Sequence, residues 1–168
     1  AHVGALERDR ELLFRNATVY IGEIEFDFEP EITTPPAGLT GLRYLKMENS
    51  RLDSTKLNGL EGMTWLVSLD LSGNQISTLG FLETLTGLES LDLSTNAIMD
   101  VTPLAALTGL TTLDLRFNAI QEVYGLAGLT ALETLDLSTN LISDASPLGS
   151  LTQLTWLSIA DNKVTDIS

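Results

Sequence analysis

The stretch LTGLESLDLSTNAIMDVTPL, from Leu85 to Leu104, decides the fold because it recurs along the chain. It returns as LTALETLDLSTNLISDASPL from Leu129 to Leu148, and variants of its central phrase LDLSTN lie before, between and after these two copies. Each phrase closes on an asparagine, and these residues are 22 positions apart: Asn74, Asn96, Asn118, Asn140 and Asn162. A constant period of this length predicts a solenoid of stacked coils.

A degenerate copy, LKMENSRL from Leu45, precedes the regular ones. It has Ser50 in place of the asparagine, and the step to the next copy is 24 residues, with the two extra residues between Leu52 and Leu57. The repeats therefore number about six, and we assign them to residues 39–168.

Within each phrase the side chains alternate. Leu91 and Leu93 point to one side, and Ser90, Asp92 and Ser94 to the other, as the two-residue period of a strand requires. One coil cannot bury its own leucines, so neighbouring coils must stack and pair their strands in a parallel sheet. The outward side chains then form an open concave face.

The return segments differ from the strands. Leucines such as Leu82, Leu85 and Leu88 recur there at three-residue steps, which favours 3₁₀ or irregular turns over full α-helices. The fold class is thus an α/β repeat solenoid in which a right-handed coil carries a parallel concave sheet and convex 3₁₀ or irregular returns. We expect the asparagine ladder to be structural, because an amide can satisfy backbone donors and acceptors together at the bend after each strand.

The pattern LxxLTxLxxLDLSxNxIxDxxPL closely resembles the 22-residue leucine-rich repeats of bacterial internalins, and the resemblance runs from about Leu39 to Ser168. It implies a leucine-rich-repeat fold and recognition of, or adhesion to, a protein through the concave sheet. It also implies a secreted or surface-exposed bacterial protein. Similar repeats occur in a regulatory subunit of type-1 protein phosphatase and in a dynein light chain, so a cytoplasmic regulatory scaffold is the alternative.

Both ends depart from the regular repeat. Residues 1–38 do not resemble the usual internalin cap, and we expect a short helix over Ala5–Arg15 and a strand over Val19–Phe28 that pairs with the first repeat. The alternative is a strand left from a preceding domain. The last repeat stops at Ser168 where other copies continue with Pro-Leu, which suggests a truncated end.

Composition narrows the functional classes. The 168 residues carry nine Lys+Arg against 23 Asp+Glu, a net charge of −14, which repels nucleic acid and favours a basic protein partner. No apolar run approaches the roughly 20 residues of a membrane span, so direct membrane insertion is not expected. With no cysteine, and His2 as the single histidine, we expect no cofactor, no metal site and no enzyme.

Asp70, Asp92, Asp114 and Asp136 form one column across the expected concave face, and we assign the last three to partner binding. We interpret the column mainly as part of the repeat consensus. A calcium site is a less favoured alternative, and a glycan hydrolase built on two carboxylates about 5 Å apart is a remote one.

The residues that break the concave pattern are better candidates for recognition. Tyr44 and Trp156 replace serine or threonine in the first column, Arg116 replaces serine in the third, and Phe117 follows it. Exposed aromatic and arginine side chains most often anchor protein interfaces, so these four join the predicted partner-binding set. The structural alternatives are that Tyr44 and Trp156 cover the ends of the solenoid and that Phe117 packs on the strand-exit loop.

Overall fold

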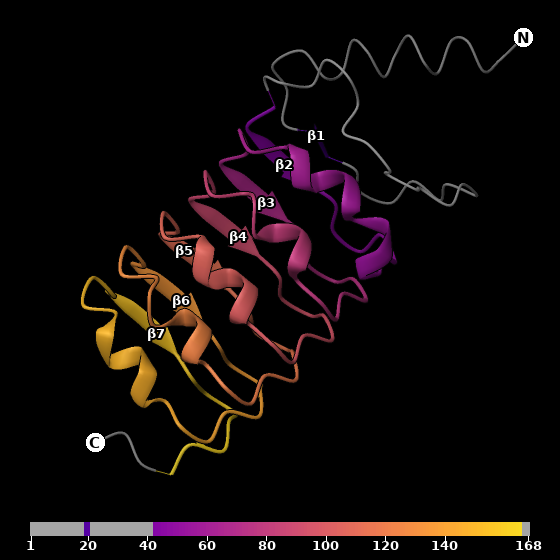
Figure 1. Ribbon diagram of the computed structural model, residues 1–168. Helices are drawn as coiled ribbons and strands as arrows, with labels where there is room; N and C mark the ends of the chain where they lie inside the picture. The colour runs from indigo at the N-terminus through magenta and orange to yellow at the C-terminus, as the bar shows by residue number, and fades with distance from the viewer. Residues whose placement is uncertain (1–18, 21–41, 166–168) are drawn as a thin grey trace, which may run out of the picture.

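The computed structural model describes residues 19–20 and 42–165, and Figure 1 shows their stacked coils. Parallel strands follow one another in chain order and form a seven-stranded sheet. The strands are β1 (Val19–Tyr20), β2 (Tyr44–Lys46), β3 (Ser68–Asp70), β4 (Ser90–Asp92), β5 (Thr112–Asp114), β6 (Thr134–Asp136) and β7 (Trp156–Ser158). Strands β2 to β7 belong to the six predicted repeats, and β1 adds a seventh strand.

Short 3₁₀ helices occupy the return segments, which confirms the prediction from the three-residue leucine steps. They are η1 (Ser54–Lys56), η2 (Asn58–Gly62), η3 (Gly80–Leu82), η4 (Thr102–Ala106), η5 (Tyr124–Leu126) and η6 (Ser146–Ser150). In Figure 1 they stack along the other side of the coils from the strands. The first described coil has two such turns, η1 and η2, where the others have one, and this accommodates its two extra residues. The register is therefore undisturbed, and Tyr44 still pairs with Ser68.

The core fills the space between the sheet and the 3₁₀ turns. The inward leucines of the middle strands, such as Leu113 and Leu115, have no exposed surface, and neither does Ile120 after the strand. Each coil contributes the same layer, and burial against both neighbours makes the layer continuous. The last coil differs, because Leu157 is 42% exposed where its counterpart Leu135 is fully buried.

The asparagine ladder joins each coil to the one before it. The Nδ2 group of Asn118 donates to the carbonyl oxygens of Leu93 and Leu115, both at 3.0 Å. Its Oδ1 atom accepts from the backbone N–H of Ile98, also at 3.0 Å. One side chain thus satisfies backbone groups in two coils, the structural role expected for the ladder.

The residue before each asparagine lies in the left-handed backbone region. Gly73 has a φ of 68°, while Thr95, Phe117, Thr139 and Asp161 have values of 53° to 56°. Glycine adopts this region freely and other residues adopt it at a cost. The turn after each strand therefore fixes a left-handed backbone geometry whichever residue is present.

At the amino-terminal side, β1 pairs in parallel with β2, with Val19 opposite Leu45. The rest of the expected strand to Phe28, the helix over Ala5–Arg15 and the boundary after residue 38 lie outside the described residues. The division into a cap over residues 1–38 and a repeat domain over residues 39–168 remains a prediction.

Candidate functional site

The outward side chains of β2 to β7, with the residue two positions after the last residue of each strand, form what we call the strand face. Strand pairing aligns Asp70 with Asp92, Asp92 with Asp114, and Asp114 with Asp136. The column ends at Lys46 on β2 and Ser158 on β7. The structure therefore brings together the aspartates that the sequence placed in one column.

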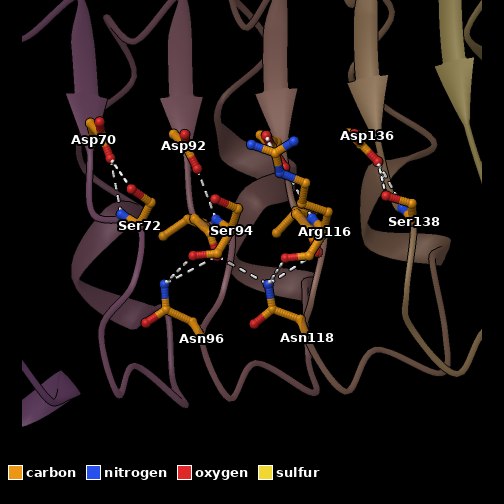
Figure 2. Close-up of polar contacts among 12 residues, drawn as sticks. Asp70, Ser72, Asp92, Ser94, Asn96, Arg116, Asn118, Asp136 and Ser138 are labelled. Atoms are coloured by element: carbon orange, nitrogen blue, oxygen red, sulfur yellow. Dashed lines mark hydrogen bonds and ion pairs between the residues drawn. The ribbon is translucent and has the colours of Figure 1, made fainter. Parts of the chain in front are cut away.

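Each aspartate also closes a local turn. Its Oδ1 atom accepts the backbone N–H two residues on, from Ser72 at 3.0 Å, Ser94 at 2.9 Å, Arg116 at 3.1 Å and Ser138 at 2.8 Å. The hydroxyls of Ser72 and Ser138 donate to the same oxygens. These bonds, drawn in part in Figure 2, give the aspartates a structural role at the strand exit.

Two cations are paired with this column. The Lys46 Nζ atom lies 2.7 Å from Glu48 Oε2 and 2.9 Å from Asp70 Oδ2. These two hydrogen bonds raise the pKa of Lys46 above its ordinary value, and the bond to Glu48 has the larger effect. Partial burial alone would raise the pKa of Asp70, but hydrogen bonds from Ser72 and Lys46 outweigh it and hold that pKa low.

Arg116 is the second paired cation. Its Nε atom lies 3.2 Å from Asp114 Oδ2, and Figure 2 shows its guanidinium in the row of aspartates between Asp92 and Asp136. The pKa of Asp114 is nevertheless raised, because burial and the neighbouring carboxylates outweigh the backbone hydrogen bond and the charge of Arg116. Asp92 and Asp136 form no ion pair within the described part of the chain.

The aromatic residues singled out in the sequence are exposed. The exposed fractions are 54% for Tyr44, 49% for Trp156 and 53% for Phe117. Tyr44 and Trp156 lie in the same strand-face column but on β2 and β7, so they are far apart, and only Phe117 adjoins Arg116. Trp65 is partly buried against the core, and its Nε1 atom has no hydrogen-bond partner among the described residues.

Several exposed side chains beyond the strands were missed by sequence reasoning. Leu141 is 37% exposed, Met99 60% and Tyr124 63%, and the Tyr124 hydroxyl lies 3.3 Å from Asp144 Oδ2. Comparing the coils position by position beyond the strand phrase would have found them, since Leu141 aligns with Gln75 and Lys163.

Neither a metal centre nor a membrane span stands out within residues 19–20 and 42–165. No group of three or more His, Asp or Glu residues there is arranged to hold a metal ion. No helix in these ranges is long and apolar enough to cross a membrane.

The repeat, the parallel sheet and the asparagine ladder define a solenoid of the leucine-rich-repeat class. The family described as "Leucine Rich repeats (2 copies)" matches residues 64–106 and 108–150, just over half of the chain. The chain therefore belongs to the leucine-rich-repeat family and, within it, is internalin-like.

Solved structures support the assignment of this chain as internalin-like. The internalin InlF of Listeria monocytogenes is 36% identical with a TM-score of 0.70, over 73% of this chain and 36% of that one. Internalin C2 of the same species is 33% identical with a TM-score of 0.71, over 78% and 57%. The chain thus spans less than two thirds of either internalin.

A third structure shows the fold alone. The leucine-rich-repeat ectodomain of the receptor kinase SOBIR1 from Arabidopsis thaliana is 24% identical with a TM-score of 0.62, over 73% of this chain and 70% of that one. No curated protein matched the sequence.

Proposed function

We propose that this chain is a non-catalytic module that binds a protein carrying basic groups, through the strand face. One observation carries the proposal, namely an open sheet face on which carboxylates outnumber cations. Its charged residues are Lys46, Glu48, Asp70, Asp92, Asp114, Arg116 and Asp136. Because Asp92 and Asp136 have no cation of their own in the described residues, a basic partner would gain two new charge pairs.

The leucine-rich-repeat family supports an interaction role, and likeness to two Listeria internalins supports a bacterial protein at the cell surface or in the medium. The competing scaffold function would place the protein in the cytoplasm. Protease treatment of intact producing cells distinguishes the two, because a surface protein is cleaved and a cytoplasmic one is protected. Protection in intact cells, followed by cleavage after lysis, would favour the scaffold.

The binding face is tested by blocking it. Peptides selected from a random display library on the wild-type protein should be rich in Lys and Arg, and their binding should weaken as salt rises. Thr112→Trp introduces a bulky side chain on the strand face, in the same column as Trp156 of β7, so the sheet already accommodates tryptophan in this column. The substitution should reduce binding of the selected peptides by roughly tenfold or more. Ala105→Trp, exposed on η4, is the matched control and should bind normally.

Acidic or neutral selected peptides would contradict the basic partner, and equal binding by the Thr112→Trp variant would contradict the strand face. The absence of catalysis is tested separately. Hydrolysis of any member of a glycan panel that disappears in both Asp92→Asn and Asp114→Asn would make the chain an enzyme.

A further inference from the structure

Four apolar residues line the side of the solenoid where the chain leaves β4, β5 and β6. We call Ala97, Phe117, Ala119 and Leu141 the exit shelf. Phe117 is 53% exposed and Leu141 37%, Ala97 is exposed, and Ala119 is partly buried. The same positions hold polar residues or glycine in the outer coils, namely Gly73 and Gln75 in the coil of β3, and Asp161 and Lys163 in the coil of β7.

The shelf is not needed to build the coils. The residue that closes the core at this bend is the next isoleucine, and Ile98, Ile120 and Ile142 are all fully buried. The turn itself does not require an aromatic residue either. Thr95 and Thr139 hold the same left-handed backbone conformation as Phe117, with φ values of 56°, 55° and 55°. Phe117 therefore puts a phenyl ring at a position where neighbouring coils fold with threonine.

Phe117, in the middle of the shelf, directly follows the strand-face residue Arg116 in the chain. The Nε atom of Arg116 is held by Asp114 Oδ2 at 3.2 Å. Asp92 and Asp136 lie one strand away on either side, with no cation among the described residues. Asp92 and Asp136 thus lie in the same coils as the shelf residues Ala97 and Leu141. Adjacent strands in a sheet lie about 4.8 Å apart, so the two carboxylates are separated by about 10 Å.

We infer that the exit shelf receives an apolar side chain from an extended basic segment whose two cations pair with Asp92 and Asp136. This inference rests on the proposed protein-binding function and names the partner's chemistry. A polyproline II segment repeats every three residues and rises about 3.1 Å per residue, so residues three apart share one side at about 9 Å. The segment that fits has two basic residues three positions apart, with an apolar residue at either of the two positions between them. It would lie along the solenoid axis and cross the strands.

Defined peptides test this directly. The probe pair carries Lys-Leu-Pro-Lys or Lys-Pro-Leu-Lys between short Gly-Ser flanks, with blocked ends and a fluorescent label for anisotropy measurements. One control replaces leucine by serine. A second places the two lysines on adjacent residues and so removes the spacing. At low salt we expect one of the probe pair to bind, and both controls to bind at least roughly fivefold more weakly.

Substitutions taken from neighbouring coils isolate the shelf without disturbing the repeat. Phe117→Thr introduces the residue found at Thr95 and Thr139, and Leu141→Ala introduces the residue found at Ala97 and Ala119. Each should weaken the probe roughly three- to tenfold. Tyr124→Thr removes an aromatic residue that is more exposed than Phe117 and lies on η5, where the coil of β4 has Thr102. It should leave binding unchanged.

The outcomes separate the shelf from the proposed function. Equal binding of the leucine and serine peptides, or unchanged binding by Phe117→Thr, would overturn the shelf while leaving a basic partner on the strand face. Failure of both probes to bind would also overturn the shelf, and the display selection would still decide the proposed function. Loss of binding in Phe117→Thr but not in an Asp92→Asn, Asp136→Asn double variant would overturn the assigned cation contacts.

Discussion

Replacement of Asn140 by alanine tests the physical basis of coil stacking. Asn140 is 5% exposed, and its Oδ1 atom accepts from Ile120 N–H at 3.0 Å. Its Nδ2 group donates to the carbonyl oxygens of Leu115 at 2.9 Å and Leu137 at 3.1 Å. A longer bond joins Nδ2 to the carbonyl oxygen of Ser138 at 3.3 Å. Asn140→Ala removes all four bonds and leaves backbone groups of two coils without their partner.

The expected cost follows from those four backbone groups. A buried polar group that loses its partner costs about 1–3 kcal/mol, and partial relaxation or entry of water reduces the sum, so we expect a loss of about 2–4 kcal/mol in the free energy of unfolding. Urea denaturation followed by circular dichroism measures this loss. Gln121→Ala removes an exposed amide in the same coil as β5 and should change stability by less than about 0.5 kcal/mol. Equal effects of the two substitutions would refute the ladder argument.

Asn140→Asp adds a test that depends on pH. The isosteric carboxylate would place a second acceptor against the carbonyls of Leu115 and Leu137, so its folded-state pKa should be raised. A group with a raised folded-state pKa contributes most stability below its unfolded pKa of about 3.9 and loses it as pH rises. Asn140→Asp should therefore be most destabilised relative to wild type at neutral pH and should recover towards pH 4. A difference that did not change with pH would contradict this mechanism.

Three further predictions concern backbone geometry, coil spacing and the aspartate column. Thr95→Gly should raise the melting temperature and stabilise by about 0.5–1 kcal/mol, because relief of the left-handed backbone cost exceeds the entropy cost of glycine. Gly125→Ala should destabilise by about 1–3 kcal/mol in urea denaturation, because the added Cβ would lie 2.7 Å from Thr102 Cα, whereas Gly128→Ala, with nothing within 4 Å, should be neutral. Asp70 has a lowered pKa, so its contribution is present above about pH 4 and lost as pH falls, and Asp70→Asn should cost up to about 1 kcal/mol at pH 7 and less at pH 3. The raised pKa of Asp114 has the opposite sign, so Asp114→Asn should cost less than Asp70→Asn at pH 7, as denaturation at both pH values would show.

The fold could be predicted from the sequence because every coil has the same pattern of inward leucines, which are buried only when neighbouring coils stack. The period from Asn74 to Asn162 fixes the coil length, and the alternation around Leu91 and Leu93 fixes which side chains are buried. Tertiary packing then had little room to override the local pattern. Even the irregular first repeat kept the register of β2 and β3, because its two extra residues lie in the return segment with η1 and η2.

The candidate site was less predictable because some of its residues lie beyond the strand columns, where the repeat sets no alternation of buried and exposed positions. Arg116 and Phe117 broke those columns and were therefore singled out, but Leu141 was not, since leucine in this chain is usually a core residue. Its exposure depends on the bend after β6, where the next residue, Ile142, takes the core position. The ion pair of Lys46 with Asp70 follows from strand register, whereas the raised pKa of Asp114 depends on burial that no spacing reveals.

The repeat itself supplies the control that most binding sites lack. A residue required by the coil should have equivalents in the other coils, as the ladder residue Asn118 does. Where neighbouring coils hold a different residue at the equivalent position and the backbone conformation is the same, the residue is not required for that conformation. Phe117 meets the second condition, because Thr95 and Thr139 adopt the same φ in the same hydrogen-bonded turn. The half-exposed phenyl ring of Phe117 buries less apolar surface than a core aromatic residue and so contributes less to stability. Recognition of a partner is therefore our explanation for its presence, and binding measurements on Phe117→Thr can confirm or refute it.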